Sequence, residues 1–574
     1  MYDNTTFSDS RLIQDFVSRS ESIRTKLSHA SWSRGISNFF SESIPFSYST
    51  STEFAEQLLH LIDCFISEGN LKTCRVHELG AGLGLLSKNI VDVANNNFMH
   101  MSHQLHVEVS DSSKESLEAI NTLDIFKEHR HRISTHVVDC LQPDFAQPPH
   151  VVIMAYLLDS LPTRHIEIDN GRIYELHVRT SLRKNAIIID TTEMPPRILE
   201  EDDIKTLLQG PLNDRKKALL GQLVECLEEE TMFIPLDDAS LPADERVELE
   251  AFIGTLDTTT KLRFNFSYAC HKVLHHLFEN APEQALICTY DMGFIQKDTC
   301  PEVEQLYGTF GACMFFSIFF PHLAYIAQKF GFETCFSDYT EGQSQMGIFF
   351  KGIPVQKLQA TFHRVFHEEG GEKPYKIQRS LIELPSNKDS FSSELTQSMA
   401  ALSPKEKESY TLLYGIAQAY QKRGGRDEAE GYANQLIKAY GRSAISAYYL
   451  KADLLNESGQ HQEALACLKD AIEAAPAYFR LHHLKALIAG SNKQYNMFLE
   501  AARESLKYAP DRSYILWDHL LTMALVYLEL NQTRKSRDIF MWISNTELHF
   551  PGILPSTLVK RATAISKQFE GFLK

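Results

Sequence analysis

The hydrophobic positions of residues 1–370 alternate between helical spacing and short buried runs. Apolar residues from Phe54 to Phe65 recur at helical spacing, and a strand is predicted to end near Val137. Further strands are predicted at 75–79, 105–109, 151–155, 186–190 and 286–290. This alternation is typical of the α/β class with a doubly wound, mainly parallel sheet. Residues from about 196 to 280 are predicted to form a helical insertion.

The C-terminal third of the chain has a different pattern. Segment 371–402 is polar and rich in turn residues, which predicts a linker, and residues 403–574 are predicted to be helical. Small residues recur there: Gly424 and Gly459 are 35 positions apart, and matching positions hold Ala417, Ala452 and Ala486. This resembles tetratricopeptide repeats, whose small residues let paired helices pack closely.

The repeat pattern predicts three related units in this all-α solenoid, and a weaker fourth around Ala524 and Tyr527. Segment 554–573 is predicted to cap the array, because an end unit must cover the apolar face of its neighbour. A non-repeating helical bundle is the alternative.

Composition and charge narrow the classes of function. The 574 residues include 57 basic and 74 acidic ones, a net charge of −17, which disfavours a nucleic-acid partner. Residues 200–250 contribute −10 of this charge, either as a solvated surface or as a field that attracts a basic substrate. The ten cysteines form no C-x-x-C pair, and His271 and His275 have no acidic partner at a fixed offset, so no metal site is expected.

The location expected from the sequence is cytoplasmic. The longest apolar stretches are too short to cross a bilayer, and residues 1–4 lack the basic and apolar pattern of a secretory signal. The scattered cysteines fit a reduced compartment. Neither membrane insertion nor a membrane partner is expected.

One glycine-rich turn carries the candidate chemistry. The segment Glu78-Leu79-Gly80-Ala81-Gly82-Leu83-Gly84 leaves a predicted strand and opens a predicted helix. Leu85 stands where a dinucleotide fingerprint needs its third glycine, and no Gly-Lys-Ser or Gly-Lys-Thr follows to make a P-loop. A carboxylate before the loop repels phosphate but suits a ligand with ammonium and sulfonium groups. The segment resembles motif I of class I S-adenosylmethionine-dependent methyltransferases, which makes S-adenosylmethionine the expected cofactor.

Three more acidic residues follow predicted strands. The second strand ends in Val107-Glu108-Val109-Ser110-Asp111, and an acid there can accept both ribose hydroxyls of a nucleoside. Glu108 is the first candidate for this contact and Asp111 the second. Asp139 follows the third strand, where methyltransferases often accept a bond from the adenine amino group.

Further motifs occur in a fixed order along roughly residues 40–352. They are Ser47 to Phe54, Glu78 to Gly84, Val107 to Ser110, Leu158-Asp159-Ser160-Leu161-Pro162, Asp291-Met292-Gly293, Phe320-Pro321-His322-Leu323 and Gln343 to Gly347. Their order resembles that of the MidA-like family of methyltransferases. The resemblance implies methylation of protein arginine, with Gly80, Gly82 and Gly84 under the methionine part of the cofactor and Glu108 on the ribose.

The chain departs from this family at one pair of positions. An Asn-Glu pair usually precedes the Leu-Asp-Ala-Leu-Pro-like stretch, and here Ala155-Tyr156 takes its place. A protonated acceptor must lose its proton during methyl transfer, so Asp159, Tyr156 and Asp291 are the candidate catalytic residues, in that order. The alternative role for Asp159 is capping the helix that follows. An acid-poor strand end also suits a neutral nucleophile.

The sequence thus supports three hypotheses. The first is a methyltransferase that acts on a protein, with arginine as one possible target, recruited through the repeats. The second is an adaptor or assembly factor that keeps the fold, with weak or no catalysis, and works through protein binding. The third is a small-molecule methyltransferase.

Overall fold

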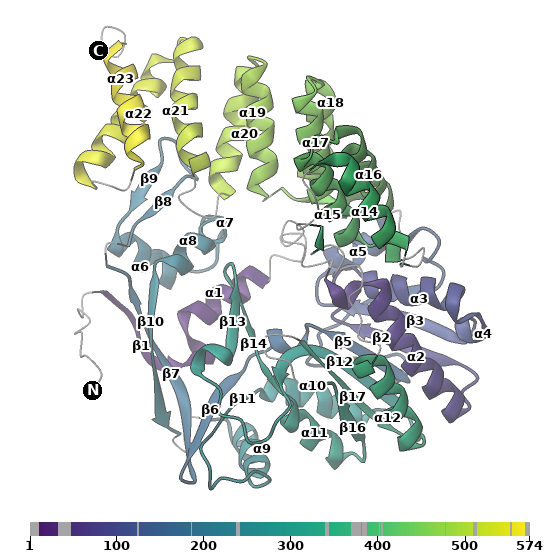
Figure 1. Cartoon of the computed structure of the whole chain (residues 1–574). Helices are drawn as coiled ribbons and strands as arrows, with labels where there is room; N and C mark the ends of the chain where they lie inside the picture. The colour runs from purple at the N-terminus through teal and green to yellow at the C-terminus, as the bar shows by residue number, and fades with distance from the viewer. Residues whose placement is uncertain are drawn as a thin grey trace.

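The computed structural model covers one chain in which helical repeats lie across one side of an α/β region (Figure 1). It describes residues 11–568 apart from 33–46, 123–125, 185, 237–240, 339–343, 369–379, 382–386, 401, 403–405, 477, 509–513 and 551–553. Gln343 of the last predicted motif lies outside the described residues.

The main sheet has the strand order β16-β17-β12-β5-β2-β3-β4. Its strands are β2 (Cys74–Leu79), β3 (Leu105–Asp111), β4 (Ile133–Val137), β5 (Val151–Ala155), β12 (Ala285–Phe294), β16 (Glu333–Phe336) and β17 (Ser344–Lys351). The strands from β4 to β12 are parallel, and β17 is antiparallel to both of its neighbours. The chain extends the sheet from β2 in one direction and then from β5 in the other. This confirms the predicted doubly wound fold.

Both faces of this sheet are buried because side chains alternate along each strand. On β5, Val151 and Ile153 join a core with α2 (Thr52–Gly69), α3 (Leu85–Asn97) and α12 (Val355–His363). Val152 and Met154 join a second core with α10 (Tyr268–Glu279) and α11 (Phe320–Lys329). The buried run that predicted this strand is thus apolar toward both layers.

A second sheet lies beside the first, with the order β1-β7-β6-β11 and with β10 paired to β7. Its strands are β1 (Leu12–Ser18), β6 (Arg164–Asp169), β7 (Arg172–Leu182), β10 (Leu227–Pro235) and β11 (Leu262–Phe266). Asn170 and Gly171 both have positive φ, 49° and 72°, so they make the tight turn between β6 and β7.

The insertion predicted to be helical over about 196–280 also contains strands. Helices α6 (Glu201–Gln209), α7 (Asp214–Ala218), α8 (Leu220–Glu225) and α9 (Ala243–Ile253) alternate there with β9 (Arg197–Leu199), β10 and β11. The acidic run Glu228-Glu229-Glu230 lies on β10, paired with β7, and Glu229 forms a 2.6 Å ion pair with buried Arg19. Part of the acidic segment is therefore structural.

The C-terminal region is an array of antiparallel helix pairs, as predicted. The pairs are α15 (Tyr410–Lys422) with α16 (Arg426–Tyr440), α17 (Ile445–Glu457) with α18 (His461–Ala474), α19 (Phe479–Ser491) with α20 (Tyr495–Tyr508), and α21 (Tyr514–Glu529) with α22 (Thr533–His549). Helix α23 (Ser556–Gln568) follows and packs on α22 and α21. Ala417, Ala452 and Ala486 are fully buried, which lets the helices approach closely.

The repeats contact the α/β region at both ends of the array (Figure 1). At the first end, α14 (Lys388–Ala400) buries Phe391 and Leu395 in the core that also holds Phe362 of α12 and Leu412 of α15. Thirteen of the 32 residues of the predicted linker therefore form a packed helix. Its apolar residues are spaced four apart, which a turn-rich composition concealed.

At the other end, a hairpin of β8 (Ile188–Asp190) and β9 packs against the repeats. Ile189 and Met194 contact the apolar core of α19, α20 and α21, and the Thr191 hydroxyl donates a hydrogen bond to the Leu506 carbonyl. The strand predicted at 186–190 therefore lies outside the main sheet. The array is held at both ends.

The turn inside each helix pair has one residue with positive φ. These residues are Gly424 (75°), Gly459 (77°), Lys493 (56°) and Asn531 (56°). Lysine pays a steric penalty in this conformation, so Lys493→Gly is expected to stabilise the array by about 0.5–1 kcal/mol. The control is Lys469→Gly at an exposed position of α18, which is expected to cost about 1 kcal/mol. Urea unfolding measures both, and destabilisation by Lys493→Gly would contradict the assigned turn.

Candidate functional site

The glycine turn lies at the point where the strand order of the main sheet reverses, between β2 and β5. Gly80, Gly82 and Gly84 have φ of 75°, 53° and 68°, values that residues with a side chain rarely adopt. The N–H groups of Gly80 and Ala81 both donate to the Ser110 carbonyl on β3, at 2.9 Å. Ligands of open α/β sheets bind in this crevice, outside the carboxyl ends of the strands.

Two of the three glycines are also required by close packing within the protein. A Cβ on Gly80 would lie 2.9 Å from Cδ1 of Leu157, and one on Gly84 would lie 2.6 Å from Cδ1 of Ile120. Leu157 belongs to the segment after β5, so that segment packs directly on the glycine turn. The role of all three glycines under the methionine part of a cofactor stays a prediction.

Glu78 lies beneath the turn, 5% exposed, and is bonded to the next helix. Its carboxylate accepts hydrogen bonds from the Ser87 N–H (3.0 Å) and the Ser87 hydroxyl (2.5 Å). Burial raises the pKa of Glu78 to about 7. The side chain therefore ties β2 to α3, which differs from the prediction that it faces the ammonium group of a ligand.

Asp111, the second candidate for the ribose contact, ends β3 beside the glycine turn. Its carboxylate accepts from the Gly82 N–H at 2.9 Å and from the Ser113 N–H at 2.8 Å. Burial raises its pKa above the ordinary value. The carboxylate thus holds the turn and stands at the carboxyl edge of the sheet.

Glu108, the first candidate, stands three residues earlier, opposite His77 in the middle of β3. Its carboxylate lies 3.4 Å from Nδ1 of His77, a contact that lowers the pKa of Glu108. At about 3.3 Å per strand residue, Glu108 is roughly 10 Å short of the strand end. The prediction placed the strand end too early, and the position at the edge belongs to Asp111.

Asp139 follows β4 and is exposed. Its carboxylate accepts a hydrogen bond from the Leu141 N–H at 3.0 Å, which closes its own turn. The Val138 N–H donates to the Asp111 carbonyl at 3.1 Å, so this segment lies beside the end of β3. The structure therefore brings Gly82, Asp111 and Asp139 to one edge of the sheet.

Asp159 and Asp291, two of the catalytic candidates, are buried together. An oxygen of Asp291 accepts from the Asp159 N–H at 3.3 Å, and the other accepts from the Thr289 hydroxyl at 3.1 Å. Burial raises the pKa of Asp291 to about 7, and burial with the repulsion of Asp291 raises the pKa of Asp159 as well. Asp291 thus caps the turn after β5, the role considered for Asp159.

Tyr156, the remaining catalytic candidate, directly follows β5 with a φ of 52°. Its hydroxyl accepts a hydrogen bond from Ser344 at 2.9 Å, and its N–H donates to the Tyr290 carbonyl. Desolvation raises the pKa of Tyr156 to about 12, so the phenol stays protonated at neutral pH. Tyr156 can donate or accept a hydrogen bond, but it is a poor general base.

Tyr290 contacts Tyr156 and also Tyr48, and sequence reasoning selected neither of these two tyrosines. The ring of Tyr290 on β12 contacts the rings of Tyr156 and Tyr48 at centroid distances of 5.5 and 5.8 Å. Tyr48 lies within the motif Ser47 to Phe54, and Tyr290 directly precedes Asp291. Both tyrosines belong to motifs found in the sequence, but only the order of the strands shows that they lie close together.

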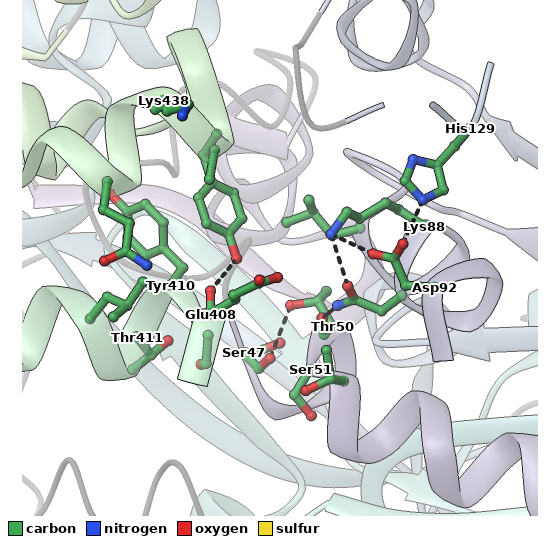
Figure 2. A pocket seen from close by; sticks show the side chains of 18 of the residues that line it. Ser47, Thr50, Ser51, Lys88, Asp92, His129, Glu408, Tyr410, Thr411 and Lys438 are labelled. Carbon is green, nitrogen blue, oxygen red and sulfur yellow. Dashed lines mark hydrogen bonds and ion pairs between the residues drawn. The ribbon is translucent and has the colours of Figure 1, made fainter. Parts of the chain in front are cut away.

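A cavity of about 480 Å³ separates α3 and the Ser47–Ser51 segment from the first repeat (Figure 2). On one wall, Asp92 accepts from Lys88 at 2.8 Å and from His129 at 2.7 Å, and these bonds lower the pKa of Asp92 despite its burial. The opposite wall carries Lys438 and Thr411 (Figure 2). Sequence reasoning could not place this cavity, because it depends on how the repeats dock.

Among the residues that the structure describes, no group of three or more metal-binding side chains occurs. No described helix is both long enough and apolar enough to span a membrane.

Two family models match parts of the chain. Residues 55–250 match a family described as "Putative S-adenosyl-L-methionine-dependent methyltransferase", and residues 445–478 match a tetratricopeptide repeat. No curated protein matches the chain.

Several solved structures resemble parts of the chain. An uncharacterised protein of Burkholderia thailandensis is 12% identical, with 59% of this chain and 88% of that chain covered and a TM-score of 0.38. A second protein of the same organism, bound to S-adenosyl-homocysteine, is 12% identical over 58% and 93%, with a TM-score of 0.32. MamA of Desulfovibrio magneticus is 18% identical over 31% and 98%, with a TM-score of 0.26.

The match over residues 55–250 supports S-adenosylmethionine as the cofactor of the α/β region. The residues present fit that group: a glycine turn without bulky side chains, the Asp111 carboxylate and Asp139 meet at the edge where such ligands bind. The C-terminal region contains tetratricopeptide repeats, a fold that commonly binds other proteins.

The buried carboxyl of Glu78 predicts a dependence of stability on pH. Between pH 4.5, where an unfolded Glu titrates, and about 7, the folded protein holds a proton that the unfolded chain has lost. Stability therefore falls as pH rises through this window. Glu78→Gln removes the titration, so the variant should gain about 3 kcal/mol relative to wild type between pH 4.5 and 8. Urea unfolding at pH 4.5 and pH 8 measures the stability of the variant relative to wild type. A relative stability that is the same at both pH values would contradict the burial of Glu78.

Proposed function

We propose that the protein is an S-adenosylmethionine-dependent methyltransferase that acts on a protein held by its repeats. The observation that carries the proposal is the glycine turn with positive φ, bonded to Asp111 at the switch point of a doubly wound sheet. The order of the short motifs supports a relative of the MidA-like family within this class.

The chain's own residues bind and orient the cofactor, which supplies an activated methyl group. In the proposed arrangement, Asp111 accepts the ribose hydroxyls, and Asp139 accepts a bond from the adenine amino group. Glu78 acts indirectly, because it fixes α3 under the turn through Ser87. Glu108 has no cofactor contact in this arrangement.

In this proposal the repeats form a binding surface at a fixed position relative to the α/β region. Both ends of the array are packed against the α/β region, through Phe391 at one end and Ile189 at the other. A protein bound to the array is thus held at a defined distance from the strand ends, which aligns the acceptor as well as raising its local concentration. Arginine as the acceptor has less support, because Asp159 and Asp291 are buried and Tyr156 replaces the family carboxylate.

A second candidate function has its own supporting observation. Leu157 packs on Gly80, and the Asp159–Asp291 pair is buried under the turn after β5, so no described carboxylate among the catalytic candidates is exposed. This favours an adaptor that binds the cofactor, has little or no catalysis and works through protein binding. The two candidates share the cofactor site and differ in methyl transfer.

Cofactor binding tests the proposed site. Asp111→Asn is expected to weaken S-adenosylmethionine binding about tenfold, because a charge-assisted hydrogen bond to the ribose is lost. Glu108→Gln, three residues earlier on the same strand, is the matched control and is expected to leave affinity within about twofold. Calorimetry on the full chain measures both. A weaker affinity of Glu108→Gln with normal affinity of Asp111→Asn would restore Glu108 to the ribose.

Methyl transfer separates the candidate functions. The full chain is incubated with methyl-labelled S-adenosylmethionine and a lysate depleted of small molecules, beside Gly82→Val as the inactive control. Label in a protein band with wild type alone is the expected result. Label in the metabolite fraction of an undepleted lysate would support a small-molecule acceptor instead. Cofactor binding without transfer to either fraction would support the adaptor.

A further inference from the structure

Three partly exposed tyrosines form a cluster at the carboxyl end of β5, where Tyr290 of β12 pairs with Ala155. Tyr48, Tyr156 and Tyr290 are its members, and Tyr290 contacts the other two edge to face. Phe54 supports the cluster from the buried side, with its ring centroid 4.9 Å from that of Tyr290. This tyrosine cluster lies next to the Leu157 side chain that packs on the glycine turn.

Tyr156 is held in an unfavourable backbone conformation. The other residues with positive φ and a side chain, Asn70, Asn170, Lys493 and Asn531, lie in tight turns or at helix ends. Tyr156 follows a strand, and a bulky residue with this φ is sterically strained. Strain of this kind persists where the surrounding structure imposes it, and it is concentrated at functional sites.

The relative orientation of the rings limits what can bind. The Tyr290 ring makes interplanar angles of 74° with Tyr156 and 63° with Tyr48. A flat ligand needs parallel rings on which to stack, whereas rings set at steep angles form a corner that suits a compact, rounded group. Sites that bind alkylated ammonium ions through cation–π contacts surround the cation with several aromatic rings.

The charge near the cluster has the sign that a cation needs. Asp159 and Asp291 are the carboxyl groups that act electrostatically on Tyr156. They lie beneath the tyrosines in a buried pair that shares hydrogen bonds with one turn. A cation at the cluster favours loss of a proton from this pair, and the resulting negative charge attracts the cation strongly because the surroundings are apolar.

We propose that the tyrosine cluster is the acceptor-recognition element of the site and binds an alkylated ammonium head group. Tyr156 is its specificity-determining residue, with an aromatic face where the resembling family has a carboxylate. The role of the cluster in acceptor recognition rests on the proposed methyltransferase function. Binding of a cation to the cluster can nevertheless be measured without any methyl transfer.

The test uses choline as the cation and 3,3-dimethylbutan-1-ol as its neutral analogue of the same shape. Titrations of the full chain are followed by saturation-transfer NMR. Choline is expected to bind with a millimolar dissociation constant, at least about tenfold more tightly than the neutral analogue. Equal affinity for the two probes, or no binding of choline, would overturn the proposal.

Variants locate the binding at the cluster. Tyr156→Leu removes the ring and is expected to weaken choline binding at least about fivefold, whereas Tyr156→Phe keeps the ring and most of the affinity. Tyr174→Leu, on strand β7 of the second sheet, is the matched control and should bind choline as wild type does. Unchanged binding by Tyr156→Leu would overturn the assignment.

Calorimetry with S-adenosylmethionine on the same samples separates the two proposals. If the cofactor fails to bind wild type while choline discrimination persists, the proposed function fails and the cation site stands. If the cofactor binds and choline discrimination is absent, the cation site fails and the proposed function stands.

Discussion

The site depends on how strand β3 holds the glycine turn. The Ser110 carbonyl accepts the N–H groups of Gly80 and Ala81, and the Asp111 carboxylate accepts the N–H of Gly82. These bonds fix a left-handed backbone that only glycine adopts without strain. They form only because β2 and β3 are parallel neighbours that end at the same edge. The conformation of the glycine turn and the position of the candidate ribose contact therefore both depend on the order of the strands.

At the same edge of the sheet, burial separates the carboxyl groups that stabilise the fold from those that can bind a ligand. Glu78, Asp159 and Asp291 are buried, and their raised pKa values follow from desolvation first. They brace the turns around the crevice. Asp139 is exposed and Asp111 partly so, which leaves them available to a ligand. In the proposed site, the tyrosine cluster on the other side of this edge recognises the acceptor.

Buried parallel strands could be predicted from the sequence because they are apolar on both faces, as β5 is. The repeats could be predicted where small residues recur, but their turn signal fades where Lys493 and Asn531 replace glycine. The hairpin of β6 and β7 was missed although Asn170-Gly171 is a strong turn signal. β7 also pairs with β10, which lies in the acidic segment 200–250 where helices were predicted.

Site residues were harder to predict because they depend on register and on contacts between distant segments. Glu108 and Asp111 differ by three positions, and only the pairing of His77 with Glu108 shows which of them reaches the edge. The contact of Leu157 with Gly80, and the meeting of Tyr48, Tyr156 and Tyr290, join segments far apart in the chain. No local pattern encodes such contacts.

The most direct test of the central claim is hydrogen exchange of the full chain with and without S-adenosylhomocysteine. A ligand bound at the switch point should slow exchange in peptides that cover residues 80–84 and 111–113, and leave the second sheet unchanged. Protection confined to the cavity between α3 and the first repeat, or no protection at all, would contradict the assignment of the cofactor to the glycine turn.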